Sequence, residues 1–210
     1  MMDFRAACTA LFLCTATPLS AHPHVFVDIS MTLRTNDAGQ VTEVEVTWAY
    51  DELYSLLILE DMGLDPDADG VLTEAELQTV KGFDLNWIEG FQGDLYAVGP
   101  SGDVLVLGAP VGTQTVLENG MLVSGHVRRF VEPVSALTLR AYDPTFYTAY
   151  DLQGRVTAPK GCTVGIEAVD LDKAYTLVEE ALYKSPPKND DEYPEVGEAF
   201  ADVVRVECGR

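Results

Sequence analysis

A short acidic stretch, residues 65–76, carries the clearest chemical pattern in this chain. It reads Asp-Pro-Asp-Ala-Asp-Gly-Val-Leu-Thr-Glu-Ala-Glu. Ca²⁺ prefers about six to eight oxygen ligands, and alternate residues of a tight loop can supply them. Gly70 would provide the sharp bend that such a loop needs at its sixth position. The spacing therefore predicts an EF-hand-type Ca²⁺ site, with the carboxylates of Asp65, Asp67 and Asp69, the backbone carbonyl of Val71, Thr73 through a water molecule, and both oxygens of Glu76 as ligands.

The same stretch has a second interpretation that needs no metal. Its first six residues favour a polar turn, and Thr73 with Glu76 forms the Ser/Thr-x-x-Glu capping box of a following helix. The two interpretations are compatible, because the exit helix of an EF-hand begins at the same place. Glu60 and Asp61 stand where an entering helix is usually apolar, and Gly63 is typical of a helix end. The sequence has no second loop of this kind, so we expect a single loop rather than a paired sensor.

Residues 1–21 have the features of a secretory signal peptide. Arg5 gives a weakly basic start, and residues 6–16 form an apolar run that is too short to span a membrane. Leu19-Ser20-Ala21 is a suitable cleavage site. We therefore expect export to the periplasm, one mature metal-binding domain over residues 22–210, and no integral membrane segment.

Histidines at the start of the mature chain form a second candidate metal site. Cleavage after Ala21 would leave His22-Pro23-His24, so the amino terminus and two imidazoles would lie close together. These groups suit Zn²⁺, Cu²⁺ or Ni²⁺. The square-planar amino-terminal motif is excluded because Pro23 has no N–H to lose, which leaves a brace made by the amine and imidazole of His22 with another side chain. His126 is a further candidate ligand from a neighbouring strand, and the alternative is that the terminal histidines are exposed and bind nothing.

The chain is strongly acidic. It has 34 Asp and Glu residues against 13 Lys and Arg residues, which gives a formal net charge of −21. This charge argues against binding to nucleic acid or to an anionic membrane, and it suits a protein that attracts cations. Solubility alone is the alternative explanation for the charge.

The cysteines predict one disulfide. Cys8 and Cys14 lie within the expected signal peptide, which leaves Cys162 and Cys208. In an oxidising compartment an even pair favours a disulfide, which would tie the last strand to an earlier one. A thiolate metal site is disfavoured because the sequence contains no CxxC motif.

The hydrophobic pattern predicts mainly short strands. Alternation over residues 25–33 and 44–50 indicates a hairpin, and Asn119-Gly120 indicates another between residues 113–118 and 121–131. Other strands are expected at residues 95–98, 104–107, 136–142, 146–152, 164–168 and 203–208. Helices are expected at residues 51–62, 74–88 and 171–184.

These elements predict an α+β fold. We expect one mainly antiparallel, β-sandwich-like domain with an inserted EF-hand-type helix–loop–helix and one C-terminal helix.

Three segments carry a resemblance to a known family. They are His22-Pro23-His24-Val25-Phe26-Val27-Asp28, the acidic loop, and Tyr142-Asp143-Pro144-Thr145-Phe146-Tyr147. Together they resemble the DUF1007 family of exported bacterial proteins, labelled as the periplasmic part of an uncharacterised ABC-type transport system. The resemblance implies a link to divalent-metal transport and a membrane metal transporter as partner. It also implies that His22, His24 and the Asp143 segment take part in a transition-metal site.

No enzyme motif is present. The sequence lacks a Gly-x-Ser-x-Gly elbow, a P-loop and an HExxH motif, so we expect a protein that is not an enzyme. The leading hypothesis is a periplasmic metal-binding accessory protein that holds Ca²⁺ in the loop and a transition metal at the histidine start. The alternative is a calcium-stabilised adhesion or scaffold module whose histidines have no metal role.

Overall fold

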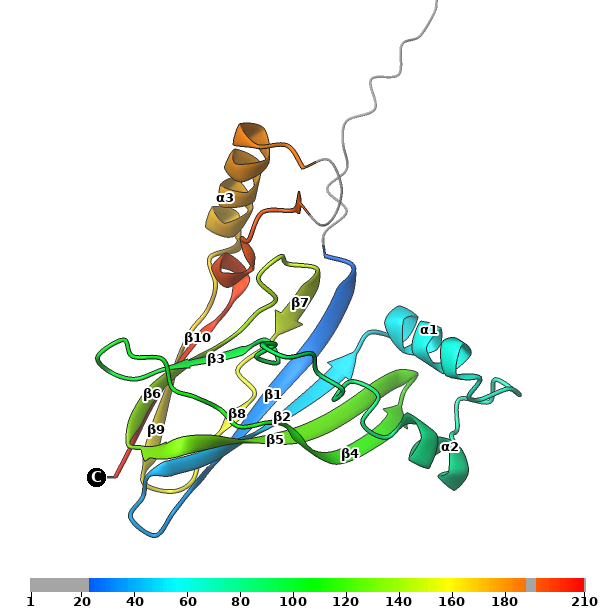
Figure 1. Ribbon diagram of the computed structural model, residues 1–210, viewed down its shortest axis with the longest axis horizontal. Helices are drawn as coiled ribbons and strands as arrows, with labels where there is room; N and C mark the ends of the chain where they lie inside the picture. Colours follow the sequence, from blue (N-terminus) through cyan, green and yellow to red (C-terminus); the bar gives the residue numbers. More distant parts are fainter. Residues whose placement is uncertain (1–22, 188–191, 210) are drawn as a thin grey trace, which may run out of the picture.

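A computed structural model describes residues 23–187 and 192–209 (Figure 1). Within these residues the fold is mostly β, with two sheets and three α-helices, as expected for the α+β class. The helices are α1 (Glu52–Met62), α2 (Glu74–Val80) and α3 (Leu171–Lys184). In the described part of the chain, no helix is long and apolar enough to cross a membrane.

Sheet A is built around the predicted N-terminal hairpin. Its strands are β1 (Val25–Thr35), β2 (Val41–Tyr50), β4 (Val111–Glu118), β5 (Met121–Val134), β7 (Thr148–Asp151) and β8 (Val156–Thr157). Their order is β4-β5-β2-β1-β7, with β8 also beside β1. The predicted hairpins β1–β2 and β4–β5 are antiparallel, as is the pair β2–β5, but β7 and β8 run parallel to β1.

The strand expected at residues 146–152 is present as the shorter β7, and the preceding turn explains why it runs parallel to β1. The turn at Asp143–Phe146 closes through a hydrogen bond from Phe146 N–H to the Asp143 carbonyl, 2.9 Å. After this turn the chain lies beside the beginning of β1, where the N–H groups of His24 and Val25 both donate to the Tyr147 carbonyl. The chain therefore enters sheet A at the same end as β1 and runs in the same direction.

Sheet B has four antiparallel strands and packs against sheet A. The strands are β3 (Leu95–Val98), β6 (Ala136–Ala141), β9 (Cys162–Glu167) and β10 (Val203–Cys208), in the order β3-β6-β10-β9. Residues 104–107, expected as a strand, form only isolated bridges, Val98 with Val104 and Leu107 with Phe130. They cross from β3 of sheet B to β5 of sheet A, so neither sheet includes them as a full strand.

One hydrophobic core fills the space between the sheets. Its fully buried residues include Ile29, Met31 and Val46 from sheet A, and Leu139 and Val204 from sheet B. The alternation predicted along β1 and β2 is the reason, because every second side chain of a strand points to the same face. Full burial of each such side chain stabilises the fold by about 1.5–3 kcal/mol.

Helix α2 is much shorter than the predicted 74–88. It ends at Val80, because Gly82 adopts a positive φ of 71° and turns the chain back toward the sheet. This turn places Asp84 beside β2 and β5, where its carboxylate accepts hydrogen bonds from the hydroxyls of Tyr50 and Ser124. The apolar residues after Val80 therefore pack against the sheet from a segment that folds back, and they do not continue the helix.

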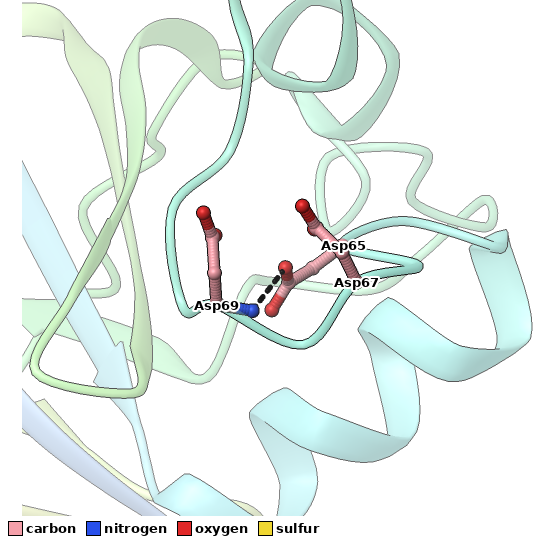
Figure 2. A group of neighbouring side chains, drawn as sticks. All are labelled: Asp65, Asp67 and Asp69. Carbon is pink, nitrogen blue, oxygen red and sulfur yellow. Dashed lines mark hydrogen bonds between the residues drawn. The ribbon is translucent and has the colours of Figure 1, made fainter.

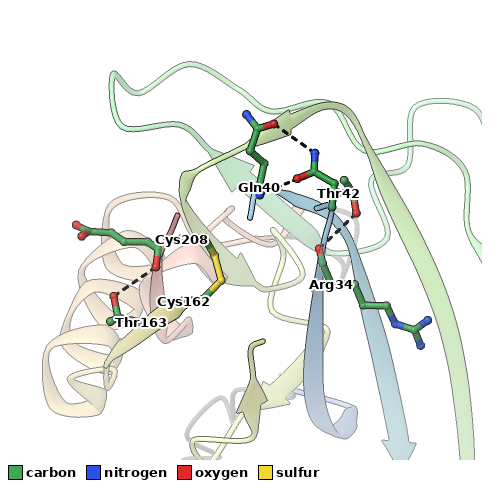
Figure 3. The surroundings of a disulfide bond; sticks show 8 residues. Arg34, Gln40, Thr42, Cys162, Thr163 and Cys208 are labelled. Atoms are coloured by element: carbon green, nitrogen blue, oxygen red, sulfur yellow. Dashed lines mark hydrogen bonds between the residues drawn. A yellow bond between two sulfur atoms is a disulfide. The ribbon is translucent and has the colours of Figure 1, made fainter. Parts of the chain in front are cut away.

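The predicted disulfide is present between Cys162 and Cys208 (Figure 3). The two residues face each other in register on the neighbouring strands β9 and β10. Figure 3 also shows that the bond lies near Gln40 and Thr42, at the turn of the β1–β2 hairpin. The disulfide thus fixes the last strand of sheet B close to the first hairpin of sheet A.

Loss of the disulfide should destabilise the protein. Its closed loop spans 46 residues, and chain-entropy theory gives about 4 kcal/mol for a loop of that length. We expect the Cys162→Ala/Cys208→Ala variant to lose about this much free energy of unfolding, measured by denaturant titration without reductant. A loss below about 1 kcal/mol would contradict the entropic account. Wild-type protein treated with reductant should behave like the variant.

Candidate metal centre

The acidic loop lies between α1 and α2, at one end of the molecule (Figure 1). Leu64 and Leu72 bracket its acidic segment and are both buried in the main core. On the entry side, Ser55 of α1 is fully buried; its hydroxyl donates to the Tyr50 carbonyl (3.2 Å) and accepts from Leu122 N–H (2.8 Å). On the exit side, Val80 of α2 is fully buried. The loop is therefore held at both ends, while its acidic residues face solvent.

Three of the predicted ligands converge in the loop. Asp65, Asp67 and Asp69 each offer a carboxylate oxygen, and these oxygens lie within 4.8 Å of one another. Figure 2 shows the three side chains on one side of the bend. Clustered oxygen donors of this kind are what a hard dication such as Ca²⁺ requires.

Backbone N–H groups of the loop order two of these carboxylates. Asp65 accepts from Asp69 N–H and from Gly70 N–H, both at 3.1 Å, and Asp69 accepts from Val71 N–H at 2.8 Å. The first of these bonds is drawn in Figure 2. The expected bend at Gly70 is present, with a φ of 75°. A side chain there would be strained, because only glycine adopts this conformation freely.

Glu76 joins the two ends of the loop. Its carboxylate accepts from Asp65 N–H (3.0 Å), from Thr73 N–H (2.8 Å) and from the Thr73 hydroxyl (2.7 Å). The capping box of α2 is thus confirmed. The hydrogen bonds from the Thr73 hydroxyl, the Thr73 N–H and the Asp65 N–H lower the pKa of Glu76, in that order of effect. Among the described residues, the converging group consists of the three aspartates, and Glu76 lies outside it.

The histidine site is only partly visible. His22 lies outside the described residues. His24 is exposed at the beginning of β1, with its ring 4.6 Å from that of Tyr147. The Asp143 carboxylate accepts from Thr145 N–H, from the Thr145 hydroxyl and from Thr148 N–H, at 2.9–3.1 Å. These contacts give Asp143 the role of a turn-forming residue, the interpretation that a Pro at the second turn position also favours.

His126 does not join His24, contrary to expectation. It pairs with Val46 of β2, which pairs with Met31 of β1. Met31 and His24 are seven residues apart, or about 23 Å at roughly 3.3 Å per residue. His126 is instead fully buried, with its ring 4.6 Å from Trp48 and 5.5 Å from Trp87. Burial, and then the nearby Arg128 charge, lower the pKa of His126 to about 4.

A polar network that the sequence analysis did not predict ties the segment after α2 to the sheets. The Asp84 carboxylate accepts hydrogen bonds from the hydroxyls of Tyr50 and Ser124, and the Asp94 carboxylate accepts from the Tyr150 hydroxyl at 2.8 Å. The partners of Asp84 and Asp94 are 34 to 56 residues away in the sequence, so only long-range pairing could reveal them.

Arg128 is also buried and belongs to the same region. Its guanidinium donates to the backbone carbonyls of Gln92, Leu107 and Gly108 and lies 4.9 Å from the centre of the Trp87 ring.

Gly197 holds the turn at Asp143 against the C-terminal region. A Cβ atom at this position would lie 1.7 Å from the Asp143 carbonyl oxygen, so any larger residue would displace the turn. Gly197 N–H also donates to the Pro144 carbonyl at 2.9 Å. Beside it, Phe146 stacks on Phe200, with ring centroids 3.7 Å apart. The turn at Asp143 is therefore part of a small second core with α3.

Comparison with known proteins shows the family of this chain. The family model described as "Protein of unknown function (DUF1007)" matches residues 7–208, and the chain belongs to this family. No curated protein matches the chain. Among solved structures, the crystal structure of AChBP from Bulinus truncatus is 11% identical and covers 91% of this chain and 90% of its own, with a TM-score of 0.29. A superposition of that quality supports no inference about fold or function.

Asp94 should make stability depend on pH. Burial raises the pKa of Asp94 from 3.8 to about 7, against the opposing effect of its hydrogen bond from Tyr150. The folded state therefore keeps a proton that the unfolded chain has lost, so this contribution is full below about pH 4 and disappears as the pH rises to about 7. The slope attributable to Asp94 should be at most about 1.4 kcal/mol per pH unit.

The test compares urea unfolding of the wild type and the Asp94→Asn variant across this range. Asparagine keeps the acceptor for Tyr150 but cannot ionise, so the variant should lose the slope and should exceed the wild type most clearly at the alkaline end. Asp61→Asn, at an exposed position, is the matched control and should follow the wild-type profile. Parallel profiles for the wild type and Asp94→Asn would refute the assignment.

Proposed function

We propose that this protein is an exported, periplasmic metal-binding accessory protein whose loop at residues 65–76 holds one Ca²⁺ ion in an EF-hand-like manner. The observation that carries the proposal is the convergence of the Asp65, Asp67 and Asp69 carboxylates within 4.8 Å. The Val71 carbonyl, Thr73 through water and Glu76 would complete the ligand set, as their loop positions require.

Electrostatics support a cation at this place. Two unit charges about 4 Å apart repel by about 1 kcal/mol even in water, and more where the protein reduces the effective dielectric constant. The hydrogen bonds from Asp69, Gly70 and Val71 N–H offset part of this repulsion. A dication would offset it more fully, and the surrounding charge of −21 would draw cations to the loop.

The ion would have a mainly structural role. The loop joins two short helices that are each anchored to the core through Leu59 and Val80, so there is little freedom for the large helix movement of a calcium sensor. Extracellular calcium modules bind with Kd values of about 10⁻⁴–10⁻³ M, which match the calcium levels outside cells. In this role Ca²⁺ would fix the loop and the α1–α2 unit against sheet A.

Calcium titration tests the proposal. We expect calorimetry to give a single site with a Kd of about 10⁻⁴–10⁻³ M, and thermal unfolding to show stabilisation of about 1.4 kcal/mol at a Ca²⁺ concentration tenfold above Kd. Glu76→Gln should weaken binding strongly, although glutamine can still form the capping box. Glu74→Gln removes the same charge two residues earlier in α2, and this variant should bind Ca²⁺ with the wild-type affinity. Equal affinities for the two variants would count decisively against the EF-hand-like assignment.

The transition-metal part of the proposal rests on His22 and His24, and it has its own test. A metal at this site should raise the melting temperature of the secreted protein at micromolar Zn²⁺, Cu²⁺ or Ni²⁺, because a ligand that binds only the folded state stabilises it. The His22→Ala/His24→Ala variant should lose this response and keep its response to Ca²⁺. No shift in the wild type would instead favour the calcium-stabilised adhesion or scaffold module, which needs no transition metal.

A further inference from the structure

Helix α1 presents a leucine-rich face to solvent. Leu53, Leu56 and Leu57 follow the i, i+3, i+4 spacing of one helical face, and they are 67%, 59% and 52% exposed. The opposite face is the one that packs on the sheet, through Ser55 and Leu59. A helix that is apolar on both faces generally has a second partner for its outer face.

Phe26 of β1 adds an exposed aromatic residue near the start of α1. Its side chain is 56% exposed, and its backbone is bonded to the residue that caps α1. Asp51 N–H donates to the Phe26 carbonyl, and Phe26 N–H donates to the Asp51 carboxylate, both at 2.9 Å. Phe26 therefore lies next to the first turn of α1, and with Leu53, Leu56 and Leu57 it defines the outer α1 face. Grouped exposed apolar residues commonly mark interaction sites.

The charged residues of α1 itself have one sign. Glu52 stands at the beginning of the helix, Glu60 and Asp61 stand at its end, and all three are exposed. No Lys or Arg occurs in the sequence between Arg34 and Lys81. Two copies of α1 packed antiparallel would bring these acidic ends together, and an anionic lipid surface would repel them. A partner with basic residues beside its apolar face would complement them instead.

We propose that the outer α1 face docks an amphipathic helix of a partner protein, one whose apolar stripe is flanked by Lys or Arg. The leucines of α1 offer ridges at three- and four-residue spacing, into which a second helix can pack. The acidic residues at the helix ends would then set its orientation. The site does not depend on an ion in the neighbouring loop, because α1 is capped by Asp51 and ends at Gly63 through backbone hydrogen bonds.

The probe is a short helical peptide of leucine and lysine, with leucines at i, i+3, i+4 and i+7 on one face. A scrambled peptide of the same composition carries the same charge but no apolar stripe. Calorimetry at physiological ionic strength and saturating Ca²⁺ should give at least about tenfold tighter binding of the amphipathic peptide. Leu53→Ser/Leu57→Ser should abolish this preference, since the charges of the protein are unchanged. Leu56→Lys should also weaken binding, because it adds a positive charge to the same face.

Leu171→Ser on α3 is the matched control. Leu171 is 52% exposed, the same as Leu57, but α3 carries Lys173 and Lys184 among its acidic residues. This variant should keep the wild-type preference. Equal binding of the two peptides, or equal loss in the α1 and α3 variants, would overturn the proposal in favour of non-specific charge attraction. Dimerisation of the protein alone, removed by the α1 variants, would overturn it in favour of a second copy as the occupant.

Discussion

The buried hydroxyl of Ser55 is the contact on which the position of the helical insertion depends. It donates to the end of β2 and accepts from the beginning of β5, so it joins α1 to two central strands of sheet A. Both backbone groups would otherwise be buried next to the helix with their hydrogen bonds unmade, at a cost of about 1–3 kcal/mol each. Asp84 provides the corresponding anchor after α2, through Tyr50 of β2 and Ser124 of β5. The acidic loop is thus a solvent-facing segment between two attachments to the same pair of strands.

This arrangement places the converging aspartates outside the main hydrophobic core. The sandwich contains the large apolar side chains, the disulfide and the buried Asp94 and Arg128. The insertion contains the converging aspartates and the outer α1 face, within a stretch that has no basic residue. Such a stretch cannot neutralise its own carboxylates by ion pairs within itself, so any countercharge has to come from elsewhere in the chain or from a bound partner. The proposed divalent cation in the loop and the proposed basic helix on α1 would each supply positive charge, at neighbouring places in this stretch.

The elements that were predicted well are those whose signals are local. Helix α3 has the predicted limits because Asp170 caps it, and β10 has them because its alternation begins and ends with the strand. Helix α2 ends earlier than predicted because Gly82 turns the chain, and the apolar residues that follow pack against the core instead. The direction of β7 could not be predicted, since it depends on where the turn at Asp143 meets β1. Strand β8 has only two residues and therefore has no periodicity.

The difference between local and long-range signals also explains which parts of the candidate site could be predicted from the sequence. The aspartates of the loop converge as their spacing predicts, because a tight turn of consecutive residues fixes its own geometry. His126 was grouped with His24 only by residue type, and the strand register that separates them is a property of three paired strands. The role of Asp94 was also hidden, because its burial and its partner Tyr150 follow from the packing of sheet B on sheet A. A carboxylate in a local motif can thus be assigned from sequence, whereas a carboxylate whose pKa is set by distant residues requires the fold.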